Sequence, residues 1–141
     1  MALRPAALLS VGFLLLLTPG GLSHKGPASV PVRVSVENDL SNTTPESYLS
    51  SVVEGGVLLG ALRRLQETEM DFKFTMKEDP NFGLFVESVN GVAGNEQEQT
   101  YWEILSESSG EYTRLEVGVG CYTPAANEHI VFRFSTWTSE Q

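Results

Sequence analysis

The sequence of 141 residues contains a single cysteine, Cys121. One cysteine excludes an internal disulfide and any zinc site built from several thiolates. In an oxidising compartment a lone thiol can bond to a second chain, but free cysteine is among the most buried residue types. We therefore predict that Cys121 is a buried, inert thiol, with covalent dimerisation through it as the less favoured alternative.

Basic residues are scarce as well. Only 9 Lys and Arg stand against 18 Asp and Glu, which gives a formal net charge of −9. Such a chain repels the phosphates of nucleic acids and of anionic lipids, and it has no basic stripe whose contacts would release counterions. The composition thus excludes a nucleic-acid partner and argues against a role on a membrane surface.

Motifs that carry catalysis are also absent. His24 and His129 lack the His-x-x-x-His or Glu-x-x-His spacing of metal ligands, and there is no Gly-x-Ser-x-Gly elbow or phosphate-binding glycine loop. Cys121 and His129 offer a thiol–imidazole pair, but a histidine that opens a strand after a buried cysteine is the favoured interpretation. Acidic segments such as Glu96-Gln97-Glu98 are typical of solvated loops, and nothing marks a glycosidase-like carboxylate pair. The sequence therefore predicts that the protein is not an enzyme.

Long apolar runs are confined to the first residues. Arg4 gives a basic start, Ala6 to Leu17 form an apolar run, and small residues follow as far as Ser23. The run is too short to span a bilayer, which takes about 20 residues. These features predict a signal peptide over residues 1–23 and a secreted, extracellular product without a membrane span.

The remaining chain has the length of one domain. We predict a flexible lead-in over residues 24–31, a folded domain over 32–137 and a tail over 138–141. Valines alternate with polar residues from Val30 to Val36, which predicts a strand with Pro31 at its start or on an edge. Further strands are predicted over residues 72–76, 84–89, 100–105, 115–119 and 129–137, and the turn Asn90-Gly91 closes the second of these.

One helix is predicted between the first two strands. Thr44-Pro45-Glu46 combines an N-cap residue, a proline at the first helical position and an acid at the positive end of the helix dipole. Apolar residues follow at spacings of three and four as far as Glu67. Gly55, Gly56 and Gly60 weaken the helix by about 1 kcal/mol each relative to alanine, and we expect close packing on a sheet to compensate. The fold class is thus α+β, one small compact domain with one helix packed on mainly antiparallel strands.

Two features point to the surface. The sequon Asn42-Thr43-Thr44 in a polar loop predicts N-glycosylation of Asn42 in a secreted chain. Several aromatic residues stand beside turns, and Phe82 lies within a Pro-Asn-Phe-Gly turn. Core packing accounts for most of these aromatics, but an aromatic turn is also typical of a binding face for a large flat or apolar ligand.

An ordered series of segments carries a resemblance to a known family. The more specific ones are Ser88-Val89-Asn90-Gly91 and Thr100-Tyr101-Trp102-Glu103-Ile104-Leu105-Ser106, and the full series covers residues 72–76, 82–91, 100–106, 118–124 and 128–135. Together they resemble the C-terminal β domain of the vitamin B12 (cobalamin) carriers intrinsic factor, transcobalamin and haptocorrin. The resemblance extends over about Val32 to Trp137.

The resemblance implies a ligand and a face that binds it. In the carriers the small β domain covers the upper face of the corrin ring, which lies between it and a helical domain. By resemblance Phe82, Phe85 and Leu115 contact the ring, and Trp102 matches a family tryptophan that we include with them but expect to be structural. The implied ligand is cobalamin or a related corrinoid, with no covalently bound cofactor and no metal held by the chain itself.

The sequence also departs from the carriers. The helical domain has no counterpart in it, and residues 107–114 replace a Gly…Thr-Pro-Leu segment of the family. Half of an enclosing site binds less tightly than the whole, because affinity depends on enclosure. The favoured hypothesis is a secreted protein that binds cobalamin or serves its transport, with a separate helical-domain or receptor protein as partner. The alternative is an extracellular protein-interaction module that keeps the fold but does not bind cobalamin.

Overall fold

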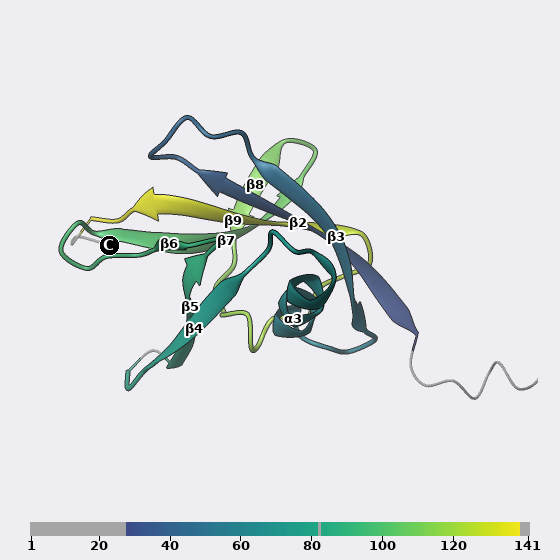
Figure 1. The fold of residues 1–141 in the computed structure, drawn as a ribbon. Coiled ribbons are helices and arrows are strands. Elements are labelled where there is room, and N and C mark those ends of the chain that lie inside the picture. The colour runs from purple at the N-terminus through teal and green to yellow at the C-terminus, as the bar shows by residue number, and fades with distance from the viewer. Residues whose placement is uncertain (1–27, 82, 139–141) are drawn as a thin grey trace, which may run out of the picture.

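The computed structural model describes residues 28–81 and 83–138, which form two β-sheets and a helix (Figure 1). The larger sheet has the strand order β3-β2-β9-β7-β8. Its strands are β2 (Ser29–Asn38), β3 (Glu46–Val53), β7 (Thr100–Ser108), β8 (Glu111–Arg114) and β9 (Glu128–Thr136). Strands β2 and β9 are parallel, and the other neighbours are antiparallel.

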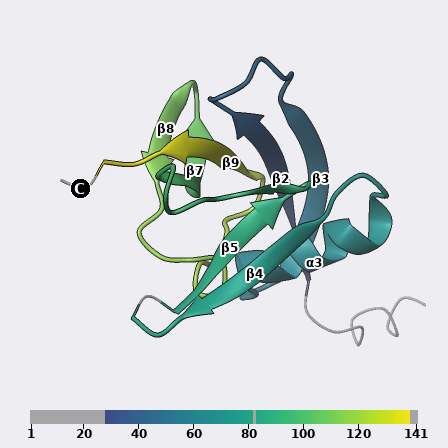
Figure 2. The ribbon, with the colours of Figure 1, turned by 60° about the vertical axis from the view of Figure 1, so that its left-hand side comes forward.

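A smaller sheet and the helix cover one face of the larger sheet. The smaller sheet consists of β4 (Phe74–Asp79), β5 (Gly83–Val89) and β6 (Val92–Ala93), and the helix is α3 (Leu58–Thr68). Figures 1 and 2 both place α3 beside β4 and β5, below the larger sheet. This arrangement confirms the predicted α+β class, with one helix on mainly antiparallel strands among the described residues.

The valine-rich segment forms β2, as predicted. Val32, Val34 and Val36 are buried, whereas Arg33 between them is exposed. Pro31 lies near the start of the strand, one residue ahead of the stretch that pairs with β9, and its carbonyl oxygen accepts a hydrogen bond from the Asn127 N–H at 2.7 Å. Residues 29–31, at the end of the segment predicted as a lead-in, already pair with β3.

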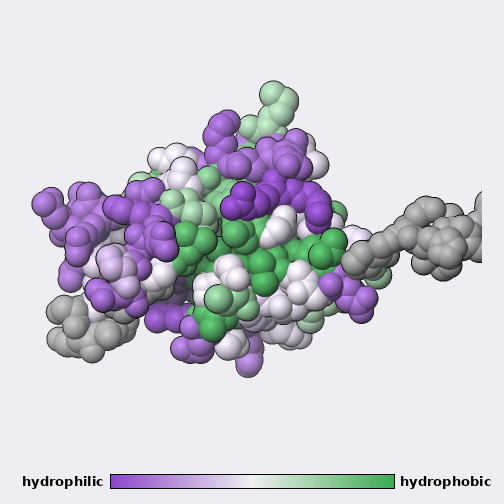
Figure 3. Space-filling model, turned by 90° about the horizontal axis from the view of Figure 1, so that it is seen from below, coloured by the Kyte–Doolittle hydropathy of each residue, from purple (hydrophilic) through white to green (hydrophobic). Residues whose placement is uncertain are grey.

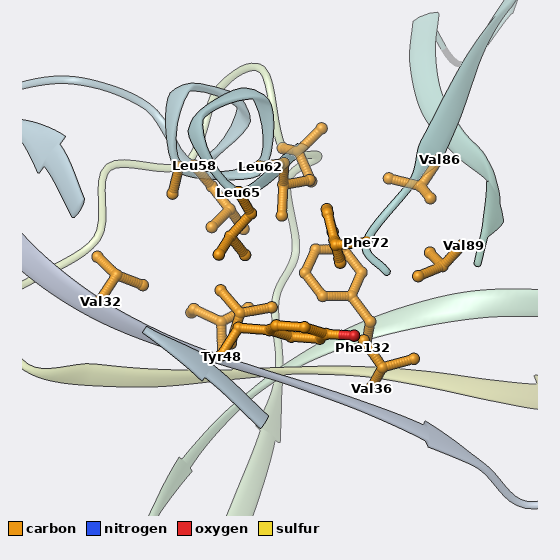
Figure 4. Packing of buried hydrophobic residues seen from close by; sticks show 14 of the residues in the cluster. Val32, Val36, Tyr48, Leu58, Leu62, Leu65, Phe72, Val86, Val89 and Phe132 are labelled. Atoms are coloured by element: carbon orange, nitrogen blue, oxygen red, sulfur yellow. The ribbon is translucent and has the colours of Figure 1, made fainter. Parts of the chain in front are cut away.

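The core lies between α3 and the larger sheet (Figure 4). Leu58, Leu62 and Leu65 follow the helical repeat and are buried on the face of α3 that meets the sheet. The rings of Tyr48 and Phe72 meet edge to face with centroids 5.2 Å apart. Full burial of each leucine stabilises the fold by about 1.5–3 kcal/mol, so this layer holds the helix in place.

The helix predicted from Thr44 to Glu67 is wrong in its first half. Residues Glu46–Val53 form strand β3, and helix begins only at Leu58. The segment is rich in serine and β-branched residues, which favour helix weakly, and its pairing with β2 satisfies the backbone. Gly55 has a φ of +82° and Gly56 lies so close to the Val53 carbonyl that a Cβ would be 2.9 Å from it, so both glycines make a turn rather than a weak helix.

One strand predicted in the C-terminal half is also wrong. The predicted strand over residues 115–119 is a loop, and β8 precedes it at Glu111–Arg114. All four residues of β8 are exposed, so the strand shows no burial pattern. The loop instead caps the start of the helix. The Leu58 N–H donates to the Tyr122 carbonyl at 2.8 Å, and the Leu59 N–H donates to the Val119 carbonyl at 2.9 Å. These bonds satisfy N–H groups that have no partner within the helix.

The other strand predictions are largely confirmed. Strands β5, β7 and β9 match segments 84–89, 100–105 and 129–137 closely, and β4 begins two residues later than the predicted start. Asn90 and Gly91, with φ of 51° and 87°, form the predicted tight turn. A register shift between Thr75 and Met76 lets both Val86 and Val89 of β5 face the core. In the described part of the chain no helix is long and apolar enough to cross a membrane.

Candidate ligand-binding face

A groove of about 500 Å³ runs between the smaller sheet and β7, and we call it the aromatic groove. Phe85 of β5 lies on it and is 41% exposed. The apolar residues along the groove come from β5, β7, the loop after β8 and the segment after β9: Phe85, Val86, Tyr101, Trp102, Ile104, Val119 and Trp137. Polar residues, among them Lys77, Glu78 and Glu87, also line it. The groove is thus an apolar floor with charged residues beside it.

Trp102 forms part of this groove and is held rigidly. Its side chain is buried, its indole N–H donates to the Val92 carbonyl at 2.8 Å, and its ring lies 5.1 Å from that of Phe134. These contacts support the structural role expected for Trp102, because its indole N–H already has a hydrogen-bond partner inside the protein. At the end of the groove Trp137 meets Tyr101 edge to face at 5.8 Å.

Leu115 lies in a second groove of about 570 Å³, which we call the hydroxyl groove. Leu115 is half-buried, and its N–H donates to the Ile104 carbonyl at 2.9 Å. The groove is lined by Ser106, Ser108, Ser109, Glu111, Thr113, Leu115 and Tyr122. The structure therefore brings Phe85 and Trp102 together and places Leu115 in a separate groove. Phe82 lies outside the described residues.

The two grooves follow each other along strand β7. Side chains at alternate positions of a strand share one face. Trp102 and Ile104 line the aromatic groove, and Ser106 and Ser108, the next residues on that face, line the hydroxyl groove. One face of β7 thus changes from apolar to hydroxyl-bearing along its length.

Exposed apolar side chains accompany the aromatic groove. Leu84, Phe85 and Val117 are 44%, 41% and 47% exposed. The loop holding Val117 lies against β5, since a Cβ on Gly118 would be 3.3 Å from the Leu84 carbonyl oxygen. Figure 3, which views the side that carries α3, β4 and β5, shows apolar side chains gathered across its middle with hydrophilic ones around them. Leu84 and Phe85 are neighbours on β5, so their side chains point to opposite sides of the strand, and of the two only Phe85 lines the aromatic groove. We call Phe85 and the other apolar residues that line the aromatic groove the apolar face.

A carboxylate organises the inner end of the hydroxyl groove. Glu128 Oε2 accepts hydrogen bonds from the hydroxyls of Ser106 and Tyr122 at 2.6 and 2.5 Å, and Oε1 accepts one from the Ala125 N–H at 2.9 Å. Burial, with the hydrogen bond to Glu128, raises the pKa of Tyr122 to about 12. Although burial opposes it, hydrogen bonding from Ser106 and Tyr122 leaves the pKa of Glu128 below its usual value. The carboxylate is therefore charged and both hydroxyls keep their protons at neutral pH.

The opposite face of the larger sheet carries a chain of polar contacts. Ser35 Oγ lies 2.7 Å from His129 Nε2, and His129 Nδ1 lies 2.6 Å from Glu107 Oε1. The order serine, histidine, acid is that of a hydrolase triad, but Ser35 is only 6% exposed in the middle of a paired strand and gives a substrate no access. The chain of contacts crosses β2, β9 and β7 and ties these strands together.

Cys121 is exposed, so the prediction of a buried thiol is wrong. It lies in a turn of the loop after β8, where its N–H bonds the Gly118 carbonyl at 3.0 Å and Val119 takes the buried position. The thiol–imidazole pair is not formed, because both ring nitrogens of His129 have other partners. His24 lies outside the described residues.

The described residues include no group of three or more His, Cys, Asp or Glu side chains that could hold a metal ion. Asn42 is exposed in the loop between β2 and β3 (Figures 1 and 2), and no residue of this loop lines either groove. Residues 1–23, predicted as a signal peptide, lie outside the described residues.

The fold and the two grooves define a small α+β domain with two open grooves on its surface. Residues 55–136 match the family described as "Domain of unknown function (DUF4430)". The match covers more than half of the sequence, and the chain belongs to this family.

The curated relatives of the chain include cobalamin-binding proteins. It is 34% identical over 123 residues to "Cobalamin binding intrinsic factor" of Homo sapiens, covering 82% of this chain and 28% of that protein. The mouse (Mus musculus) protein of the same name is 39% identical over 87 residues, 62% of this chain and 20% of that protein. "Transcobalamin-1" of Homo sapiens is 32% identical over 95 residues, 65% of this chain and 21% of that protein. The chain thus matches only 20–28% of the length of these relatives.

Solved structures agree with this relationship. The structure of haptocorrin in complex with Cbi matches with a TM-score of 0.66 and 26% identity, covering 79% of this chain and 26% of that chain. A putative metal binding protein from Ruminococcus gnavus matches with a TM-score of 0.54 and 14% identity, covering 77% of this chain and 99% of that one, which shows a shared fold only. The resemblance to the β domain of the cobalamin carriers is confirmed.

Proposed function

We propose that the chain is a secreted, non-enzymatic protein that binds cobalamin or a related corrinoid and covers one side of the corrin ring. The observation that carries the proposal is the apolar face of the aromatic groove, in a chain related to cobalamin-binding proteins. A corrin is a broad, flat and largely apolar ring. Phe85 and its neighbours on the apolar face can cover such a ring without desolvating a charge of their own.

The proposed contacts differ in how much they contribute. Phe85 is 41% exposed on the aromatic groove, and the buried Trp102 forms part of the same groove. Leu115 contacts the ring's edge from the hydroxyl groove, and Phe82, which precedes β5 in the sequence, is proposed as a further contact. Burial of the exposed part of Phe85 contributes about 1 kcal/mol, a fraction of the value for a whole side chain.

The groove is open, so we expect modest affinity for this chain alone. An open face buries one side of a ligand, and binding must also offset the lost freedom of motion. A dissociation constant in the micromolar range, about −8 kcal/mol, is expected. A separate helical-domain or receptor protein that closes over the other side would tighten binding.

Equilibrium dialysis of the secreted chain against cyanocobalamin, with the visible absorbance of the corrin as readout, tests the proposal. We expect saturable binding that Phe85→Ala weakens about fivefold. Leu49→Ala is the matched control, since Leu49 is 79% exposed on β3, away from the grooves, and its loss should leave affinity unchanged. Equal weakening by both substitutions would place the ligand elsewhere.

The alternative is an extracellular protein-interaction module. The observation that favours it is β3, which is the edge strand of the larger sheet and carries the exposed Leu49 and Val53. An edge strand can pair with a strand of another protein. Absence of binding at millimolar cyanocobalamin would overturn the first proposal and favour this one.

A further inference from the structure

We propose that the hydroxyl groove selects ligand groups that donate hydrogen bonds, and that it thereby recognises the carboxamide side chains at the rim of a corrinoid. This inference rests on the proposed function and adds a polar site to the apolar face. The groove is completed by Ser108, Ser109, Glu111 and Thr113, which belong to the segment 107–114 where the sequence departs from the carriers.

The selectivity follows from where the hydroxyl protons are. A hydroxyl has one proton to donate and two lone pairs that accept. Ser106 and Tyr122 both donate their single proton to Glu128 Oε2, at 2.6 and 2.5 Å. Toward the groove, which both residues line, their oxygens can therefore act only as acceptors.

Glu128 is held in this arrangement by the backbone. Its other oxygen, Oε1, accepts the Ala125 N–H at 2.9 Å, so the carboxylate has a fixed orientation. It cannot donate a proton to either hydroxyl while it is charged. The negative charges of Glu128 and of Glu111, which also lines the groove, disfavour a ligand carboxylate.

The position of the groove matches the rim of a ring that lies on the apolar face. Ser106 and Ser108 follow Trp102 and Ile104 on the same face of β7, and Leu115 adjoins them. A ring over the aromatic groove would direct peripheral side chains toward these hydroxyls. A carboxamide N–H₂ donates to the two acceptor oxygens, whereas a methyl ester of similar size has no proton to offer.

The experiment compares two corrinoids on the full secreted chain. Dicyanocobinamide carries peripheral carboxamides, and dicyanocobyrinic acid heptamethyl ester carries methyl esters in their place. Because the esters differ in solubility, the readout is the ratio of the two dissociation constants in each variant, measured by the visible absorbance of the corrin. The wild type is expected to favour the carboxamide form.

Glu128→Gln is the decisive variant. The Ala125 N–H cannot turn away, so the glutamine carbonyl keeps that bond and its N–H₂ group faces Ser106 and Tyr122. Those hydroxyls then accept from glutamine and can donate into the groove. The preference for carboxamide over ester should fall at least threefold, and Tyr122→Phe, which removes one acceptor, should lower it as well.

Glu54→Gln is the matched control. It removes the same charge from an exposed residue after β3 that lines neither groove, so it should leave the ratio within about twofold. Binding of both corrinoids with the same ratio in wild type and Glu128→Gln would overturn this inference alone. Failure of the wild type to bind either corrinoid would overturn the proposed function together with it.

Discussion

At the scale of single residues, polar contacts on the outer face of the larger sheet decide how stability depends on pH. The hydrogen bond from His129, aided by the Gly110 N–H, holds the pKa of Glu107 below its ordinary value of 4.5. A carboxyl whose pKa is lowered by folding stabilises the protein above its unfolded pKa. That stabilisation is lost as the pH falls through the folded pKa.

Glu107→Gln should therefore lower the melting temperature by a few degrees at pH 7, and the difference from wild type should shrink below about pH 4.5. Thermal unfolding followed by circular dichroism between pH 3 and 7 checks this. Glu116→Gln is the control, because it removes the same charge from an exposed position in the loop. A difference that stays constant across this range would show that the ionised Glu107 is not the stabilising form.

The sequence predicts some of these residues and not others, for physical reasons. The alternation of valines with polar residues in β2 predicts which side chains are buried. Asn90-Gly91 predicts a turn because Asn and Gly tolerate the left-handed conformations that this turn needs. The partners of His129 lie on distant strands, Ser35 and Glu107, and local spacing carries no signal of them. Cys121 was predicted to be buried from its residue type, but the turn at Gly118 directs Val119 inward instead.

At the scale of elements, the glycines between Val53 and Leu62 show why the chain changes from strand β3 to helix α3 at this point. The sequence predicts that Gly60 is offset by close packing, but nothing lies within 4 Å of a Cβ built there. Gly60 is an interior residue of α3, so that glycine costs stability without a packing reason. Gly56, in the turn before the helix, has no such room.

Gly60→Ala is accordingly expected to stabilise the fold by about 0.5–1 kcal/mol. Gly56→Ala should destabilise it by 1 kcal/mol or more, on the order of a small packing clash, because the Cβ would be 2.9 Å from the Val53 carbonyl. Urea unfolding of the two variants gives both values. The same sign of change in both would contradict the division of this segment into strand, turn and helix.

The binding elements were partly predictable. The resemblance pointed to Phe85 and Trp102, which do share a groove, and to Leu115, which lies in the neighbouring one. The hydroxyl groove was not predicted, because β8 has four exposed residues and no burial pattern. Alternation along β7 from Trp102 to Ser108 is the one sequence signal that could have found it.

At the scale of the whole molecule, the predicted glycan lies outside both grooves, because no residue of the loop between β2 and β3 lines either of them. The loop with Asn42 is at the top of Figures 1 and 2, and α3, β4 and β5 are at the bottom. Enzymatic removal of N-glycans should shift the mass of the secreted chain, as Asn42→Gln should. Neither change is expected to alter cyanocobalamin affinity by more than about twofold, about 0.4 kcal/mol. A larger change in dialysis would contradict the proposed location of the ligand.

The parallel pairing of β2 with β9 has a kinetic consequence. The first and last described strands are neighbours in the interior of the larger sheet, with Val32 opposite Glu128 and Asn38 opposite Phe134. Contacts between residues so far apart in the chain are slow to form, because the intervening loop must be closed first. Strand β9 must be synthesised before β2, which already pairs with β3, can pair on its other edge. Until then β2 and β3 form a hairpin with an unpaired edge, and the larger sheet assembles only late in synthesis or after it.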